Sequence, residues 1–417
     1  MRILHTSDWH LGKMLYKRSR IGDHRAVLAE IVGIAQSHSP DLIIHSGDLF
    51  DNRRPSYQDE GLAIDTLRNL ATLAPVVVLR GNHDSPSWFQ IIGRAFGPHS
   101  NIHLIDKPRE DPKDGGVLSF TGADGTILRL GVLPFIDASA TDLFIHPEQW
   151  QSEYAQTVGR LERELATELQ RDLDPSREVA VFAAHEYLTG AELSGTERAT
   201  NQGYATSPDD IPAVAYAAFG HIHNPQPLPH SKVTGYYAGS PIQLDLGEAG
   251  QTKNVLIVDL RPGQPADITP VPLTAGRTLR KFTGTLDKLQ AQASSFGDEM
   301  CMFFIETQTD DPTLYEQVHA LVPTVTILGV RPIPLGSQGW DLAPDDCEDA
   351  EDAEPDLAEL FDEFLATRPG VVADVGRVRA QFRQLLACLD DERPFTLPDV
   401  DNLLTTPLDT TSKESGR

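Results

Sequence analysis

The first half of the chain alternates short apolar runs with longer stretches in which apolar residues recur every three or four positions. The short runs predict buried β-strands and the longer stretches predict amphipathic helices. Strands are predicted at Arg2–Thr6, Leu42–His45, Val76–Leu79, Ile127–Leu133, Val179–Ala183, Tyr216–Phe219 and Val255–Leu260, and helices at Asp23–Ser37 and Tyr57–Leu73. This alternation predicts a layered α/β sheet, in which sites tend to lie beyond the carboxyl ends of strands.

A second, smaller unit is predicted after a Pro- and Gly-rich stretch at Arg261–Pro265. The first domain is assigned to residues 1–275 and the second to residues 276–340. Strands are predicted in the second unit at Arg280–Thr283, Cys301–Thr307 and Val325–Val330, and helices at Leu286–Ser294 and Pro312–Leu321. Together these elements predict a small α+β fold.

The C-terminal part has a different composition. No Lys or Arg occurs from Asp341 to Thr367, and residues 341–356 are predicted to form a solvated acidic linker. Apolar residues then recur at helical spacing: Leu357, Leu360, Phe361, Phe364 and Leu365, followed by Val375, Val378, Phe382, Leu385 and Leu386. They predict a helical pair within residues 357–392, which either docks a partner chain or packs back on its own body. Residues 393–417 are predicted to form a flexible tail.

Composition and charge restrict the class of protein. The 417 residues are 40% hydrophobic and 23% charged, which is near the globular average. The formal charge of −26 excludes binding of DNA or RNA by the overall field, so metal ions, a local basic patch or a partner would have to attract them. The cysteines, Cys301, Cys347 and Cys388, lie far apart, and neither a signal peptide nor a membrane-length apolar stretch is apparent. A cytoplasmic protein without a membrane segment is expected.

Five clusters of potential metal ligands follow predicted strand ends: Asp8-Trp9-His10, Gly47-Asp48-Leu49-Phe50-Asp51, Gly81-Asn82-His83-Asp84, His185 and Gly220-His221-Ile222-His223. Carboxylates combined with imidazoles suit Mn, Fe or Zn better than calcium. Glycine precedes three clusters, as expected where a strand end must turn sharply. Each cluster alone has a simpler explanation, such as a turn capped by Asp48. Their order and completeness predict one shared metal site.

This ordered set resembles the calcineurin-like metallophosphoesterase superfamily, whose pattern is D-x-H, GD-x-x-D, GNH-D/E, a lone His and G-H-x-H. Within it, four segments resemble the SbcD family of bacterial nucleases: Thr6–Gly12, Gly47–Asp51, Gly81–Ser85, and Gly220–His223 followed by Gly239–Ile242. The resemblance is strong from Met1 to about Asp259 and continues as domain order beyond it. It implies a four-layer α/β/β/α sandwich with a small α+β capping domain and C-terminal helices that bind a partner.

The resemblance also implies two divalent metal ions, with manganese expected. It assigns them to seven ligands: Asp8, His10 and His223 for the first ion, Asn82, His185 and His221 for the second, and Asp48 as a bridge between both. His83 would donate a proton to the leaving alkoxide, and Asp51 would orient its ring. The family commonly has Gly before the lone His, whereas this chain has Ala184. Extended backbone at that position would accommodate the methyl group.

The function implied is hydrolysis of DNA phosphodiester bonds, 3′-to-5′ on double-stranded ends and endonucleolytic on single strands and hairpins, in DNA repair, recombination and replication. The implied partner is an SbcC-type ATPase. The C-terminal helices would bind it, and it would supply most of the positively charged surface that binds DNA. A homodimer of the nuclease subunit within a heterotetramer is also implied. Helices near Tyr57–Leu73 and the apolar stretch Trp88–Phe96 would form it, although core packing is the default explanation of the latter.

Basic residues gather beside the first two clusters: Lys13, Lys17, Arg18, Arg20, Arg53 and Arg54. They either contact DNA phosphates without reading the base sequence or belong to ordinary solvated loops.

Two other functions stay open. One is a related phosphoesterase acting on phosphoproteins or small phosphates. Protein phosphatases of the superfamily usually continue the second cluster as Asp-Arg-Gly and have Glu in the third, whereas this chain has Asp51-Asn52-Arg53-Arg54 and Asp84. The other is a non-catalytic scaffold, which would be free to lose ligands. No ligand of the pattern is missing from this chain.

Overall fold

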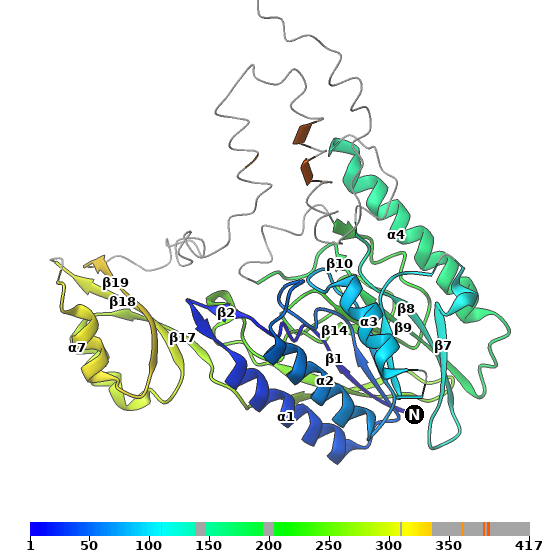
Figure 1. Cartoon of the computed structure of the whole chain (residues 1–417), viewed down its shortest axis with the longest axis horizontal. Coiled ribbons are helices and arrows are strands. Elements are labelled where there is room, and N and C mark those ends of the chain that lie inside the picture. Colours follow the sequence, from blue (N-terminus) through cyan, green and yellow to red (C-terminus); the bar gives the residue numbers. More distant parts are fainter. Residues whose placement is uncertain are drawn as a thin grey trace, which may run out of the picture. The chain divides into compact units, whose positions relative to one another are not determined.

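A computed structural model describes residues 1–97, 99–109, 111–137, 147–194, 204–308 and 311–335, together with Phe361, Val378, Arg379, Phe382 and Arg383 (Figure 1). The chain divides into one unit of residues 1–352 and another of residues 353–417. Among the described residues, no helix has the length and apolar character needed to cross a membrane.

The first sheet contains the strands whose ends carry the first three motif clusters. Its order is β16 (Asp267–Pro272), β15 (Asn254–Asp259), β1 (Arg2–Thr6), β4 (Leu42–His45), β5 (Val76–Leu79) and β6 (Ile102–Ile105). The last four strands run parallel, so their carboxyl ends meet at one edge. Three helices accompany this sheet: α1 (Ile21–His38), α2 (Tyr57–Ala71) and α3 (Pro86–Phe96).

The second sheet contains the strands that end at the fourth and fifth clusters. Its order is β13 (Gln226–Pro227), β14 (Gly235–Tyr237), β12 (Tyr216–Gly220), β9 (Glu178–His185), β8 (Ile127–Leu133) and β7 (Val117–Thr121). Strands β8, β9, β12 and β14 are parallel, and β7 and β13 are antiparallel edge strands. The helix α4 (Pro147–Gln170) accompanies this sheet.

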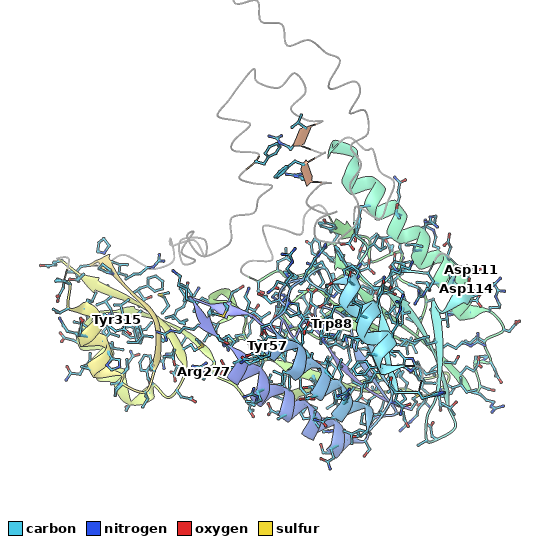
Figure 2. All side chains as sticks on the ribbon, viewed as in Figure 1. Tyr57, Trp88, Asp111, Asp114, Arg277 and Tyr315 are labelled. Atoms are coloured by element: carbon cyan, nitrogen blue, oxygen red, sulfur yellow. The ribbon has the colours of Figure 1, made fainter. Side chains whose placement is uncertain are left out.

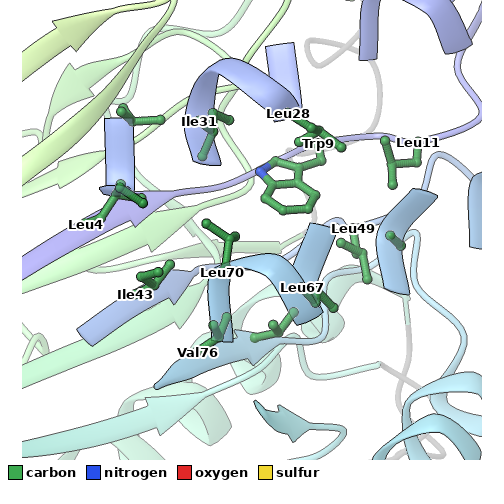
Figure 3. Packing of buried hydrophobic residues seen from close by; sticks show 14 of the residues in the cluster. Leu4, Trp9, Leu11, Leu28, Ile31, Ile43, Leu49, Leu67, Leu70 and Val76 are labelled. Atoms are coloured by element: carbon green, nitrogen blue, oxygen red, sulfur yellow. The ribbon is translucent and has the colours of Figure 1, made fainter. Parts of the chain in front are cut away.

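Three hydrophobic clusters separate four layers. The first joins α1–α3 to one face of the first sheet, as Leu28, Leu67 and Val76 illustrate (Figure 3). The second lies between the two sheets and the third joins the second sheet to α4. This arrangement confirms the expected α/β/β/α sandwich. A β-strand buried on both faces needs an uninterrupted apolar run, and β4 and β5 are apolar and buried at nearly every position.

Within the unit of residues 1–352, the predicted small α+β fold has its own parallel sheet, β17 (Leu279–Gly284), β18 (Met300–Thr307) and β19 (Thr326–Pro334), connected by α6 (Leu286–Gln292) and α7 (Leu314–Leu321). These are the strands and helices that the sequence predicts there, with bounds shifted by a few residues. Phe303 lies at the centre of its hydrophobic cluster. The remaining short elements are β2 (Met14–Leu15), β3 (Arg18–Ser19), β10 (Tyr187–Leu188), β11 (Ala205–Thr206), and the 3-10 turns η1 (Pro112–Asp114), η4 (Leu246–Glu248) and η5 (Ala293–Ser295).

Several elements were missing from the sequence-based prediction. Apart from the two-residue strands and the 3-10 turns, they are α4 and the strands β6, β7, β14 and β16. The strands among them are short or partly exposed, so their sequences lack the continuous apolar run that predicts a buried strand. Helix α4 was missed because most of its residues are polar. Its buried Tyr154, Val158, Leu165 and Leu169 have helical spacing that could have revealed it.

The predicted linker at 341–356, most of the helical pair at 357–392 and the tail at 393–417 lie outside the described residues. Within the second unit, the rings of Phe361 and Phe382 stack with centroids 3.9 Å apart. Both belong to the apolar positions that predict the helical pair.

Candidate metal centre

The first motif cluster continues from β1 with apolar residues alternating between the polar ones. Trp9 and Leu11 are fully buried in the cluster beneath the helices (Figure 3), and the Trp9 Nε1 donates a hydrogen bond to Thr6 Oγ1 at 2.9 Å. Asp8 and His10, on either side of Trp9, belong to a group of potential ligands. The fifth cluster alternates in the same way: the apolar Ile222 is buried in the core, and the potential ligands His221 and His223 lie on either side of it in the sequence.

Backbone hydrogen bonds hold the first two cluster loops side by side. The amides of Asp8 and His10 donate to the carbonyl oxygens of Gly47 and Asp48, at 2.9 and 3.2 Å. The third loop is attached by the buried Asp84 carboxylate. It accepts hydrogen bonds from the amides of Gly81, Leu49 and Phe50 at 2.8, 3.1 and 2.9 Å, respectively. Asp84 therefore fixes the relative position of the second and third clusters, a role that the motif alone did not reveal.

The structure brings all seven predicted ligands together. Asp8, His10 and His223 form a first group with ligand atoms within 4.8 Å of one another, and Asp48, His185 and His221 form a second group. His10, Asp48 and His83 form a third set that overlaps both. Asn82 Oδ1 joins the second group, 3.0 Å from His185 Nε2 and 2.9 Å from His221 Nδ1.

Asp48 lies between the two groups. Its Oδ2 atom is 3.5 Å from His10 Nε2 and 3.4 Å from His185 Nε2, while its Oδ1 accepts a hydrogen bond from the His83 amide at 3.0 Å. One carboxylate oxygen thus faces both groups, which is the position that a bridging ligand requires.

The buried atoms of the site fit divalent metal binding. His10 Nε2 and His223 Nε2 face each other at 3.1 Å, and His221 Nδ1 and His185 Nε2 at 3.3 Å. Among the described residues, the buried Asp8 Oδ2 has no hydrogen-bond partner. Converging imidazole lone pairs and an orphaned carboxylate oxygen are both satisfied by a cation, and the mixture of nitrogen and oxygen donors suits a borderline metal.

Without a cation, burial and neighbouring charges shift the pKa values of the ligand side chains in different directions. Burial raises the pKa of the Asp8 carboxyl to about 7 and lowers the pKa of His10 to about 4. Burial also acts to lower the pKa of His185, but the Asp48 carboxylate outweighs it and the pKa rises to about 9. Because an imidazole must be neutral to bind a metal, a cation at His185 displaces a proton.

The ligand backbone is strained. Asp8, His10, Asp48 and His221 have positive φ angles of 50°, 46°, 55° and 97°. Such conformations cost energy for residues with a side chain and often occur at functional sites. The surrounding hydrogen bonds between the loops hold them in place.

The three motif glycines serve two different purposes. Gly47 has a φ of 110°, as expected for a sharp turn, and a Cβ there would also overlap the His185 ring. Gly81 and Gly220 lack such a φ angle, so the predicted turn is not their reason. Their Cβ atoms would collide with the Asp48 carboxylate and the Ser46 carbonyl oxygen, respectively. Glycine is therefore required at positions 81 and 220 because the cluster loops approach each other closely there.

His83 and Asp51 contact each other in an unexpected way. His83 Nδ1 lies 2.8 Å from the backbone carbonyl oxygen of Asp51. The Asp51 carboxylate instead lies 3.2 Å from His10 Nδ1 and 3.5 Å from Lys13 Nζ. Asp51 is therefore a hydrogen-bond partner of His83 through its main chain, whereas its side chain faces His10.

Comparison with known proteins agrees with this geometry. The family model described as calcineurin-like phosphoesterase matches residues 1–225. The chain is 31% identical to the SbcD subunit of the SbcCD nuclease from Bacillus subtilis (strain 168) over 334 residues, covering 77% of this chain and 82% of that protein. It is 30% identical to the protein of the same name from Escherichia coli (strain K12) over 312 residues, covering 72% and 74%. The chain belongs to the SbcD family of calcineurin-like phosphoesterases.

The departure from the usual family pattern at Ala184 is accommodated as expected. Ala184 lies in the extended strand β9, paired with Phe219 of β12, and its methyl group is buried in the hydrophobic cluster beside α4. His185 follows at the strand end, where its Nδ1 donates to the Ser46 carbonyl oxygen at 2.8 Å.

The basic residues that were predicted to contact DNA have different environments. Lys17, Arg18 and Arg54 are exposed. Arg18 also donates to the Ile327 carbonyl oxygen, and Arg53 forms a 3.0 Å ion pair with Asp137.

Arg20 requires a correction. Its side chain is fully buried, and its guanidinium donates to the Asp23 carboxylate and to the carbonyl oxygens of Gln243 and Arg277. A guanidinium with no exposed surface cannot reach a phosphate, so the assignment of Arg20 to the DNA-contacting set is withdrawn.

One buried residue at the site of this SbcD-family chain was absent from the sequence-based assignment. Glu248, in η4, lies 3.0 Å from His223 Nδ1. It follows no predicted strand and belongs to no motif, so nothing in the sequence indicated that it lies beside the ligands.

Proposed function

We propose that this chain is the nuclease subunit of an SbcCD-type complex, which hydrolyses DNA phosphodiester bonds with two divalent metal ions, expected to be Mn²⁺. The observation that carries the proposal is the position of Asp48 Oδ2, within 3.5 Å of a ligand nitrogen in each of the two groups. Relatives named as SbcCD nuclease subunits support the choice of DNA among phosphoester substrates.

Each ion has a proposed ligand set. Asp8, His10 and His223 would hold the first, Asn82, His185 and His221 the second, and Asp48 would touch both. When bound, two such cations supply an activated water near neutral pH and neutralise charge on the phosphodiester oxygens. The chain itself would hold the seven ligands on loops that are joined by hydrogen bonds. The ligand side chains would then move little during the reaction.

His83 is the proposed proton donor to the leaving alkoxide. The Asp51 carbonyl oxygen only accepts hydrogen bonds, so His83 Nδ1 must carry a hydrogen. This leaves Nε2 to exchange a proton with the substrate. His83 is partly exposed beside the second-group ligand Asn82, and its ring packs edge-to-face on His10 with centroids 4.9 Å apart. An imidazolium fixed in this way can protonate a leaving group next to the metals.

DNA would pass over the loops after the first two clusters. Lys13, Lys17, Arg18, Arg53 and Arg54 are the proposed phosphate contacts, without Arg20. Because the whole chain carries a formal charge of −26, an SbcC-type ATPase is proposed to provide most of the positive surface. Cleavage 3′-to-5′ on duplex ends and endonucleolytic cleavage of single strands and hairpins, in cytoplasmic DNA repair, recombination and replication, belong to the same proposal.

The assembly is proposed to be a heterotetramer with two nuclease chains. The helices of residues 357–392 would bind the ATPase, and residues 276–340 would act as the capping domain. Tyr57 at the start of α2 is 80% exposed (Figure 2), and Ile91 of α3 is 63% exposed. An exposed large apolar side chain on each of these helices supports a contact between nuclease chains there. Trp88 and Phe89 of α3, by contrast, are buried in the core.

Cleavage assays test the proposed function. An end-labelled duplex and a hairpin are incubated with Mn²⁺, Mg²⁺ or chelator and the wild-type chain, the His83→Ala variant or a His103→Ala control, with para-nitrophenyl phosphates in parallel. DNA cleavage that needs metal and His83, but not His103, supports the nuclease. Intact DNA with rapid phosphomonoester turnover favours a phosphatase. Inactivity on both substrates, persisting after addition of the ATPase, together with failure to bind metal, supports the scaffold.

A further inference from the structure

His223 is held from behind by a carboxylate. Glu248 Oε1 lies 3.0 Å from His223 Nδ1. A carboxylate only accepts hydrogen bonds, so Nδ1 carries the hydrogen, and in the neutral ring Nε2 then presents its lone pair. His223 Nε2 lies 3.1 Å from His10 Nε2, within the first group of ligands. Glu248 therefore selects the tautomer of His223 that can bind the first ion.

Glu248 is itself fixed in position. It is fully buried, and its Oε2 lies 2.7 Å from Lys253 Nζ and accepts the Leu244 amide at 3.0 Å. Lys253 Nζ also donates to the main-chain carbonyl oxygen of His223 at 2.8 Å. The Glu248–Lys253 pair thus holds both the ring and the backbone of His223. A buried ion pair does not by itself indicate added stability. The presence of the Glu248–Lys253 pair beside His223 therefore needs another explanation.

The turn that carries Glu248 is braced from the opposite side. Leu246, two residues earlier, is buried in a hydrophobic cluster with Leu279 and Met302 of the β17–β19 unit. The Gln243 side chain accepts a hydrogen bond from the Leu279 amide at 2.5 Å. This packing limits movement of the turn, so the direction of the Glu248 carboxylate is fixed before any metal binds.

We propose that Glu248 is a positioning residue for the first metal ion, because it fixes the tautomer and ring direction of His223. The inference rests on the proposed function only in assuming that the two groups bind metal. Asp51 stands behind His10 in a similar way, with its carboxylate 3.2 Å from Nδ1. In the second group, His185 Nδ1 donates to the Ser46 carbonyl oxygen instead. Loss of Glu248 should therefore weaken binding of the first ion and leave binding of the second unchanged.

Metal binding tests this inference without DNA. Titrations of the full chain with Mn²⁺, followed by calorimetry and electron paramagnetic resonance, compare wild type, Glu248→Ala and Glu248→Gln. We expect wild type to bind two ions and Glu248→Ala to lose about 10–100-fold in affinity for one of them. Glu248→Gln should stay within a few-fold of wild type, because its amide oxygen still accepts from Nδ1–H. The control Asp23→Asn removes another buried carboxylate, which is hydrogen-bonded to Arg20 and Arg277 and belongs to no ligand group, and it should keep both affinities.

Three results would overturn the inference: two wild-type affinities in Glu248→Ala, equal weakening of both ions, or a wild-type His223 protonated at Nε2. The last is read from long-range ¹H–¹⁵N spectra of the wild-type histidine rings, so it does not depend on a variant that folds. Circular dichroism melting establishes folding of each variant. A wild-type chain that binds no Mn²⁺ would instead overturn the metal centre itself and this inference with it, which is a separate and recognisable result.

Discussion

The Nδ1 atom of His83 lies 2.8 Å from the backbone carbonyl oxygen of Asp51. Any residue at position 51 can provide that carbonyl, whereas only the carboxylate can hold His10 Nδ1. We therefore expect Asp51→Ala to behave as a metal-affinity variant, with about 10–100-fold weaker Mn²⁺ binding and cleavage that recovers at high Mn²⁺. His83→Ala should lose about 10²–10⁴-fold in kcat at every Mn²⁺ concentration, because it removes the proton donor.

Single-turnover cleavage measured across Mn²⁺ concentrations separates these two variants. If excess Mn²⁺ left Asp51→Ala as inactive as His83→Ala, the Asp51 carboxylate would have a direct part in the reaction and this interpretation would fail.

The position of Asp48 predicts a difference between two aspartate variants. Asp48 Oδ2 faces both ligand groups, whereas Asp8 belongs to one. Asp48→Ala should bind neither Mn²⁺ ion tightly, and Asp8→Ala should retain one. Metal content after gel filtration, measured by mass spectrometry, gives the count. Retention of one tightly bound ion by Asp48→Ala would argue against a bridging role.

Gly81 should tolerate no side chain. A Cβ at Gly81 would overlap the Asp48 carboxylate, so Gly81→Ala should displace that ligand, impair Mn²⁺ binding and destabilise the fold by about 1–3 kcal/mol. Gly33 in α1 provides a matched control, because nothing lies within 4 Å of its Cβ position. Gly33→Ala should leave metal binding unchanged and stabilise the chain by about 0.5–1 kcal/mol. Urea unfolding and Mn²⁺ titration of both variants measure the contrast, and equal behaviour would contradict it.

Asp23 should make stability depend on acid pH. Burial acts to raise its pKa, but hydrogen bonds from Arg277 and Arg20 outweigh it and lower the pKa to about 2. Because the unfolded carboxyl titrates near pH 4, its contribution of about 2 kcal/mol is complete above that pH and is lost as the pH falls toward 2. Asp23→Asn should lower the urea midpoint clearly at pH 7 and by roughly half as much at pH 3. A difference of the same size at both values would show that ionisation of Asp23 is not responsible.

The sequence was sufficient to predict much of the scaffold because the relevant patterns are local. A strand buried on both faces, such as β4 or β5, needs consecutive apolar residues, and that run is visible in the sequence alone. The order of the ligand clusters was also visible, since each follows directly from a strand end. Parallel strands bring their carboxyl ends to one edge, so the convergence of Asp8, Asp48 and Asn82 could be expected before the structure was known.

Only the tertiary structure decided which atoms of these residues meet. Asp51 offers a carboxylate and a carbonyl, and spacing cannot tell which one His83 will contact. The sequence groups Arg20 with Lys17 and Arg18, yet packing against Gln243 and Arg277 buries it. Glu248 lies 25 residues from His223, in a turn with no motif. A motif records neighbours along the chain, whereas burial and hydrogen bonding depend on neighbours in space, which are set only when distant elements pack.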